Sequence, residues 1–349
     1  MNQQKIDEQY MRRCLQLAEC GRQESRPNPM VGAVIVLPSL SPTPIPDQKS
    51  PTRSLSQVGR GYSDSASCRG GYRILGEGYH IRCGEGHAEV NAFASVRSED
   101  EVLLKEATIY VSLEPCSHYG KTPPCADLII NKGVRRVVVG CIDPFAEVQG
   151  RGVKKLRDAG IDVTVGVLEE ECRYLNRRFF TFHSKHRPYI ILKWAQTDDG
   201  FIDNYGRPLA ISTAFTKTLV HKMRSEEDAI LVGRVTDERE HPQLNVRQWV
   251  GKDPVRFVLS HDFTIDDVFA ECRRQQLQSL IVEGGRKTLL SFIEQGLWDE
   301  ARIERSPQTV GNGTPAPELP EDAKEYRRII CDGNEIISFR NPQESLPTP

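Results

Sequence analysis

The chain has no long hydrophobic run and almost no net charge. A membrane-spanning helix needs about 20 consecutive apolar residues, and the sequence has no such run. Lysine and arginine total 46 against 48 acidic residues, so the formal net charge is -2 and there is no basic excess for nucleic-acid phosphates. Aromatic residues make up only 7%. We therefore expect no membrane segment, and the composition argues against a protein that edits or binds nucleic acid.

A disulfide framework is also missing, although the chain has ten cysteines. They are scattered over 349 residues, and cysteines in a long intracellular enzyme more often bind metal or stay reduced in the core. The first residues are polar, so we expect no signal peptide and a cytoplasmic location. The length and the 38% hydrophobic content suit two domains, each with its own core.

Two short stretches carry the chemistry of a zinc site. His87 and Glu89 supply an imidazole and a carboxylate, and the run PCSHYGKTPPC supplies thiols at Cys116 and Cys125. Catalytic zinc takes three nitrogen or sulfur ligands and keeps a fourth position for water. We assign His87, Cys116 and Cys125 as ligands, which leaves Glu89 free to move protons. The order H-x-E followed by P-C and a second Cys matches the signature of zinc deaminases, although eight residues instead of two separate the cysteines.

Two alternatives to a catalytic site remain open at this level. A structural zinc site would need a fourth protein ligand, for which the candidates are Cys83, His118 and Cys141. In the second alternative the two thiols are ordinary buried cysteines. The carboxylate of Glu89 favours catalysis, because a deaminase needs a group that carries a proton from water to the departing ammonia.

A β-α alternation over residues 1–185 predicts a three-layer α/β domain with a mixed or parallel sheet. The apolar segment 31–36 is typical of a strand buried in a parallel sheet. His87 directly precedes an expected helix that begins at Ala88, so it must lie at the entry to the first turn. Further strands are expected at 73–78, 107–113, 135–140 and 161–167.

Residues 38–73 interrupt this alternation. These 36 residues hold eight serines and five prolines and show almost no apolar periodicity. Such a segment cannot bury enough surface to offset its ordering entropy, which predicts a loosely held insertion between two neighbouring strands.

A second alternation over residues 186–349 predicts another α/β domain. It opens with an apolar strand at 188–193, and Thr213 is placed to cap a helix. We expect two final strands, near 327–331 and 335–339, to close the second sheet.

Longer runs resemble the bifunctional deaminase–reductase family of riboflavin biosynthesis. RPNPMVGAVIV, HAEVNA and YVSLEPCSHYGKTPPC carry the resemblance in the first half, and RPYIILKWAQTDDGFI, HKMRSEEDAILVG, HPQLNVR and LIVEGG follow in the family's order. The resemblance implies a cytidine-deaminase-like domain followed by a dihydrofolate-reductase-like α/β domain. It also implies Zn²⁺ and NADPH as cofactors, and a phosphoribosylaminopyrimidine as the small-molecule substrate, first deaminated and then reduced at its ribosyl group.

The resemblance further implies the residues of both sites. Substrate contacts fall on Asn28, His118 and Lys121 in the first half and on Arg224, Leu244, Arg247 and Glu283 in the second. NADPH contacts fall on Ala195, Thr236, Glu240 and Gly285. The chemistry suits these roles: an ammonium group attracts phosphate, two arginines can clamp one, and N–H groups at a helix start can hold another.

Two departures from the family pattern concern the second half. Glu240-His241 stands where the family has an acidic pair. Only 22 residues separate Ser260 from Glu283, so the domain is expected to be shortened between 260 and 280. A deaminase with a degenerate, structural or dimerising reductase-like domain is therefore the alternative interpretation, and a homo-oligomer is compatible with both.

Overall fold

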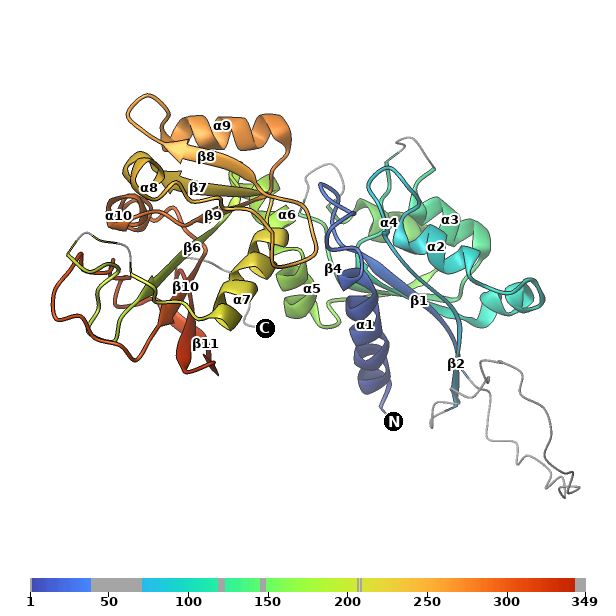
Figure 1. Cartoon of the computed structure of the whole chain (residues 1–349). Coiled ribbons are helices and arrows are strands. Elements are labelled where there is room, and N and C mark those ends of the chain that lie inside the picture. The colour runs from blue at the N-terminus through green and yellow to red at the C-terminus, as the bar shows by residue number, and fades with distance from the viewer. Residues whose placement is uncertain are drawn as a thin grey trace, which may run out of the picture.

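The computed structural model describes residues 2–38, 71–118, 123–144, 149–205, 207 and 209–342. Its strands form a five-stranded sheet in the order β2-β1-β3-β4-β5 and a seven-stranded sheet in the order β11-β12-β10-β6-β9-β7-β8. Figure 1 shows the two sheets in two adjoining halves, each with helices packed around its sheet. Among the described residues, no helix has the length and apolar character needed to cross a membrane.

The first sheet is mixed. β1 (Gly32–Pro38) runs antiparallel to β2 (Tyr72–Tyr79) and to β3 (Thr108–Leu113), whereas β4 (Arg136–Cys141) and β5 (Asp162–Val165) continue in parallel from β3. The expectation that segment 31–36 is a parallel strand is wrong, because both neighbours of β1 run in the opposite direction. Its continuous apolar run has another cause, since helices cover both faces of the sheet at this strand.

Two helical layers enclose the first sheet. α1 (Gln3–Glu19) and α5 (Glu169–Leu175) cover one face. α2 (Ala88–Ala94), α3 (Cys125–Lys132) and α4 (Arg151–Asp158) cover the other, and the 3₁₀ helix η1 (Ser98–Glu106) leads into β3. The domain is therefore three-layered, as the sequence predicts.

The second sheet has a parallel centre. β6 (Tyr189–Gln196) lies between β9 (Ser279–Val282) and β10 (Glu300–Arg305), and β7 (Ala229–Gly233) lies between β9 and β8 (Val255–Leu259). β11 (Lys324–Cys331) and β12 (Asn334–Arg340) form an antiparallel pair at one edge. The two predicted final strands are present, but β10, which the sequence analysis does not predict, joins them to the centre.

Alternate residues of the central strands face opposite helical layers. Ile190 and Leu192 pack toward α9 (Ile265–Gln275) and α10 (Arg286–Glu294), whereas Tyr189 and Ile191 pack toward α7 (Ala214–Ser225). α8 (Arg234–Glu240) follows β7. The crossover from β8 to β9 consists of α9 and its flanking turns, so the segment that the sequence analysis marks as short holds one helix.

Buried polar contacts join the two halves. α6 (Arg177–Lys185) brings Arg178 to Glu227, with Arg178 Nε 2.6 Å from Glu227 Oε2. Arg26 pairs with Asp228 at 2.7 Å, and Gln278 Nε2 donates to the carbonyl oxygen of Pro27 at 2.6 Å. The C-terminal half therefore fixes the loop that precedes β1.

Candidate active sites

Three side chains of zinc-ligand type converge at the starts of two helices. His87 is the N-cap of α2, Cys125 is the first residue of α3, and Cys116 lies in the loop after β3. His87 Nδ1 lies 3.6 Å from Cys116 Sγ and 3.4 Å from Cys125 Sγ, and the three ligand atoms lie within 4.8 Å of one another. Tetrahedral zinc with ordinary bond lengths separates its nitrogen and sulfur ligands by about 3.6 Å. The cluster therefore fits a zinc ion.

The candidate fourth ligands do not join this cluster. Among the described residues, the ligand group comprises His87 and the two thiols alone. Cys83 and His118 are exposed, and Cys141 is buried in the core of the first sheet. No described side chain therefore completes a closed set of four ligands, and three protein ligands are the number that catalytic zinc takes.

Glu114 fixes the loop that carries Cys116. Its buried carboxylate accepts hydrogen bonds from the N–H groups of Gly150 and Gly152, each at 2.9 Å, next to the start of α4. A side chain cannot replace the hydrogen at Gly152, because a Cβ there would lie 2.1 Å from the carbonyl oxygen of Pro115. The close approach of α4 thus holds the Pro115–Cys116 segment in place.

Glu89 lies beside the cluster and is 3% exposed. Burial, reinforced by the neighbouring Cys116, raises the pKa of Glu89 to about 7. The pKa of the Cys116 thiol is held below its usual range, because its sulfur interacts with Cys125, whose N–H donates to it at 3.3 Å, and with His87. A carboxyl group that titrates near neutrality is suited to accept and return a proton, although a bound cation would lower its pKa.

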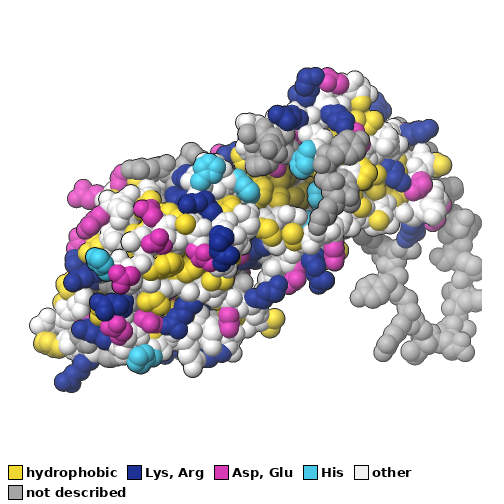
Figure 2. All heavy atoms as spheres, turned by 90° about the horizontal axis from the view of Figure 1, so that it is seen from above, with side chains coloured by type: hydrophobic (Ala, Val, Ile, Leu, Met, Phe, Trp, Pro, Cys, Tyr) yellow, Lys and Arg dark blue, Asp and Glu magenta, His cyan; other side chains and the backbone are white. Residues whose placement is uncertain are grey.

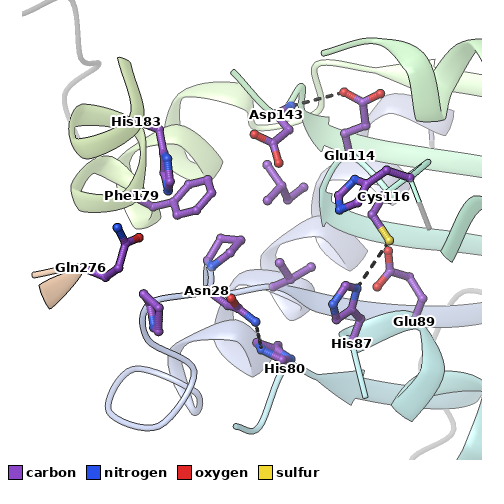
Figure 3. A pocket seen from close by; sticks show the side chains of 15 residues that line it. Asn28, His80, His87, Glu89, Glu114, Cys116, Asp143, Phe179, His183 and Gln276 are labelled. Carbon is purple, nitrogen blue, oxygen red and sulfur yellow. Dashed lines mark hydrogen bonds between the residues drawn. The ribbon is translucent and has the colours of Figure 1, made fainter. Parts of the chain in front are cut away.

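Asn28 faces the cluster across the cavity (Figure 3). Its Nδ2 lies 3.1 Å from Nε2 of His80, whose Nδ1 lies 3.2 Å from the carbonyl oxygen of Gly86. His80 is buried, and this burial lowers its pKa, so the ring is neutral and carries its proton on Nδ1. Asn28 Nδ2 then donates to Nε2, and the amide oxygen of Asn28 makes no hydrogen bond to the described residues, so it can accept one from a ligand.

These side chains line a cavity of about 330 Å³. Figure 2 shows histidine side chains gathered around a hollow with apolar walls. Phe179 and His183 of α6 lie opposite the zinc cluster, beside Gln276 of the C-terminal half (Figure 3). His118 also lines the cavity, and Lys121 lies outside the described residues.

The residues implied for NADPH mostly come together. Thr236, Glu240 and Gly285 line a cleft of about 570 Å³ beyond the carboxyl ends of β7 and β9, which we call the Gly285 cleft. The Gly285 N–H donates to Thr236 Oγ1 at 3.2 Å. Positive side chains line the same cleft, namely Arg234, Arg239, Arg286 and Lys287. Ala195, near the end of β6, is not among the lining residues.

Of the residues implied for the second substrate contact, Arg224, Arg247 and Glu283 lie close together. Arg224 donates from Nε to Glu283 Oε1 at 2.9 Å and from Nη2 to Oε2 at 2.8 Å, so its guanidinium is engaged. Arg247 is exposed and donates to the Asn245 side chain at 2.9 Å, and Arg224 Nη1 donates to the carbonyl oxygen of the same residue at 3.4 Å. Leu244 is buried in the core beneath α7. The structure therefore brings Arg224, Arg247 and Glu283 together and places Leu244 in the core.

Comparisons with known proteins agree with both halves. Residues 66–141 match the family model of the cytidine and deoxycytidylate deaminase zinc-binding region, and residues 188–269 and 262–335 match that of the RibD C-terminal domain. The riboflavin biosynthesis protein RibD of Aquifex aeolicus is 34% identical over 353 residues, covering 88% of this chain and 89% of the relative. The chain belongs to the RibD family.

Solved structures support the same family. The Thermotoga maritima protein named diaminohydroxyphosphoribosylaminopyrimidine deaminase/5-amino-6-(5-phosphoribosylamino)uracil reductase superposes with a TM-score of 0.80 at 30% identity, covering 97% of this chain and all of that chain. Acinetobacter baumannii RibD has a TM-score of 0.77 at 24% identity, covering 97% and 100% of the two chains, and shows the common fold. This RibD-family chain is therefore a riboflavin-biosynthesis protein with a zinc-binding deaminase domain and a reductase domain.

The sequence analysis does not single out several residues that shape the deaminase cavity. His80 has a local signal, because it directly follows β2 and precedes the glycine-rich turn that leads to His87. Glu114 is part of the EPC run, so its position could have been noticed. Gln276 has no local signal, since only the packing of the two halves brings it to the cavity.

The insertion expected at 38–73 is shorter than predicted, because Pro38 belongs to β1 and Tyr72 and Arg73 belong to β2; residues 39–70 lie outside the described residues. They connect β1 to β2 at the end of the hairpin remote from the cavity. Pro38 pairs with Tyr72 at that end, whereas Gly32 pairs with Tyr79 beside the cavity, about 20 Å away at the rise of a β-strand. We expect replacement of residues 39–70 by a short glycine-containing turn to leave deamination within about twofold of the parent, since the paired strands are retained. Steady-state kinetics tests this, and a large loss of activity would show that the insertion reaches the cavity.

Proposed function

We propose that this chain deaminates 2,5-diamino-6-(5-phosphoribosylamino)pyrimidin-4-one and then reduces the ribosyl group of the product to ribityl with NADPH. The observation that carries the first step is the cluster of His87, Cys116 and Cys125, with the buried Glu89 beside it and Asn28 across the same cavity. The name of the similar Thermotoga maritima protein includes both activities, which supports assigning both to this chain.

His87, Cys116 and Cys125 would hold the zinc ion, which supplies an activated water molecule when bound. Glu89, buried beside these residues, would accept a proton from the attacking water and return it to the amino group as ammonia leaves. The amide oxygen of Asn28 accepts a hydrogen bond from the pyrimidine and presents the amino-bearing carbon to the cluster. His80 keeps the Asn28 amide in this orientation, because its Nε2 accepts from the amide nitrogen.

The Gly285 cleft would hold NADPH. The cleft lies at the start of α10, whose N-cap is Gly285, and its lining includes Arg286 and Lys287, so it offers both a helix start and positive charge to the cofactor's phosphates. Arg224 and Glu283, joined to each other, lie beyond the end of β9 and would contact the substrate as a pair. NADPH supplies the hydride for the ribosyl group.

The test is incubation of the full chain with the diaminopyrimidine, with and without NADPH, followed by identification of the products. We expect the deaminated ribosyl compound without NADPH and the ribityl compound with it. Deamination without reduction would favour the alternative, a deaminase with a degenerate reductase-like domain. Absence of both products would contradict the proposed substrate.

Gln278 extends this proposal to the contact between the halves. Its side chain is 4% exposed and donates to Pro27 immediately before Asn28. We expect Gln278→Ala to raise the KM for deamination about three- to tenfold, the size of one lost hydrogen bond, with a smaller change in kcat and unchanged zinc content. Gln275→Ala is the matched control, because Gln275 is exposed on the same segment and, in the described part of the chain, its side chain bonds to Glu271 alone. An unchanged KM for Gln278→Ala would show that Asn28 does not depend on this contact.

A further inference from the structure

A second polar cavity, of about 440 Å³, lies on the other side of the reductase sheet from α9 and α10. Its floor is the face of β10, β12 and β11, and its walls come from α6 and α7. It shares no lining residue with the Gly285 cleft or with the deaminase cavity. We call it the α7 cavity.

Strand register places three donor side chains in one row on the floor. Arg302 of β10 is the pairing partner of Ser338 of β12, and Ser338 is the partner of Arg327 of β11. All three line the α7 cavity, so they share one face of the sheet, and neighbouring strands are about 4.8 Å apart. Two guanidinium groups flanking a hydroxyl offer several converging donors to one anion.

Acids also act on this row: burial lowers the pKa of Arg302, and the nearby carboxylates of Glu304 and Glu300 oppose that shift. Glu226, Glu227 and Glu300 line it, and within the described residues each has another cation near: Lys222 at 3.7 Å, Arg178 in the buried pair, and Arg177 at 3.9 Å. In the part of the chain that the structure describes, Arg302 and Arg327 have no ion pair. Arg302 Nη1 instead lies 3.7 Å from Met223 Sδ, which is a weak acceptor.

One buried donor in the same cavity makes no hydrogen bond. Arg177 is 8% exposed, and its Nε, which lies 3.9 Å from Glu300 Oε2, has no acceptor within hydrogen-bond distance among the described residues. Its guanidinium stacks on the ring of Tyr174, which also lines the cavity, at 4.1 Å from the ring centroid. A buried donor left without a hydrogen bond costs free energy, so Arg177 adds an unsatisfied positive group to the lining of the cavity.

We propose that the α7 cavity is a binding site for a phosphate group, either free phosphate or the phosphate of a small ester, held by Arg302, Ser338 and Arg327. The row provides charge-assisted donors of the kind that bind phosphate. The volume of the cavity lies within the range of small-molecule sites. The site is separate from both active sites, because it lies over the first half of β10 and the N-terminal part of β6, whereas the Gly285 cleft lies beyond the carboxyl ends of β7 and β9.

The test titrates the full chain with inorganic phosphate, ribose 5-phosphate and ribose by calorimetry at low ionic strength. We expect both phosphates to bind and ribose to give no signal, and the tighter of the two phosphates identifies the source. Arg302→Met and Arg327→Met should each weaken this binding about tenfold or more, the size of one charge-assisted interaction. Arg286→Met removes a positive side chain from the Gly285 cleft, so the change in binding heat in this variant shows how much phosphate binds in that cleft.

Arg328→Met is the matched control for Arg327→Met. Arg328 is the next residue of β11, points to the opposite face of the strand, and pairs with Glu325 and Glu335. It removes the same charge, so it should leave phosphate affinity almost unchanged. Equal phosphate affinity in wild type, Arg302→Met and Arg327→Met would overturn the proposal. So would a dimer in sedimentation that Arg302→Glu dissociates, because a second copy of the chain would then occupy this face.

Discussion

Glu89→Gln is expected to lower the kcat of deamination by about 10²–10⁴-fold while zinc content stays at one ion per chain. A loss of about 10²–10⁴-fold in kcat is the usual contribution of a positioned general acid–base group. The amide keeps the size of the buried side chain but cannot accept the proton of water and return it to the departing amine. Zinc is retained because Glu89 lies outside the cluster of His87, Cys116 and Cys125. Single-turnover kinetics and metal analysis of the same sample measure both quantities.

Glu85→Gln is the control for this variant. Glu85 lies four residues before Glu89 but is exposed, and its pairing with Arg82 is also exposed, so its substitution should leave activity unchanged. Wild-type turnover in Glu89→Gln would show that another group moves the proton. Loss of zinc in that variant would instead make Glu89 part of the metal site.

Cys125→Ser and Cys116→Ser are expected to lose zinc and, with it, all measurable deamination. Each thiolate is one of three protein ligands, and a serine hydroxyl does not ionise to replace it near neutral pH. Metal analysis after gel filtration gives the zinc content, and circular dichroism checks that the chain is folded. Cys83→Ser is the control, because Cys83 is exposed and outside the cluster. Full zinc in both variants would contradict the assignment of the ligands.

The reductase activity of the same sample is an internal control for the folding of the two cysteine variants. The Gly285 cleft shares no lining residue with the deaminase cavity, so reduction of the already deaminated compound should persist in Cys125→Ser. Parallel loss of both activities would indicate that the variant is misfolded and not that zinc alone is missing.

Local chemistry was enough to predict many of the elements. Gly133 ends α3 in the left-handed conformation, with φ of 68°, as a glycine after a helix favours. Thr213 caps α7 through its side chain, and His87 stands at the entry to α2. In each case the signal lies within a few residues of the element that it limits.

Other elements carry no such signal. β10 reads EARIER, in which only two apolar residues alternate with charged ones, so its assignment depends on neighbours β6 and β12. Residues 169–187 form α5 and α6, although their charged and aromatic composition indicates no single helical face. Tertiary packing decides both cases, and a window of sequence does not contain it.

The same limit applies to the site. The cluster of His87, Cys116 and Cys125 was predictable, because these side chains of zinc-ligand type come from two short motifs and follow the rules of metal coordination. The hydrogen-bonded pair of Arg224 and Glu283 was not predictable. The residues are 59 positions apart, and the family resemblance implies only a substrate contact for each. The contribution of Gln276 to the deaminase cavity depends on how the two halves dock.

The buried pair of Arg178 and Glu227 has a consequence for cutting the chain. The Glu227 side chain is 1% exposed and the Arg178 side chain 11%, and each comes from a different half. Burial alone opposes ionisation of Glu227, but Arg178 outweighs it and holds the pKa of Glu227 below its usual value of 4.5. A fragment that begins at Pro188 would therefore retain Glu227 without its guanidinium partner. It would also expose a surface that the N-terminal half buries in the full chain. The two halves should unfold together in calorimetry, as one cooperative transition. Neither half is therefore expected to fold normally when it is fused to another protein without its partner half.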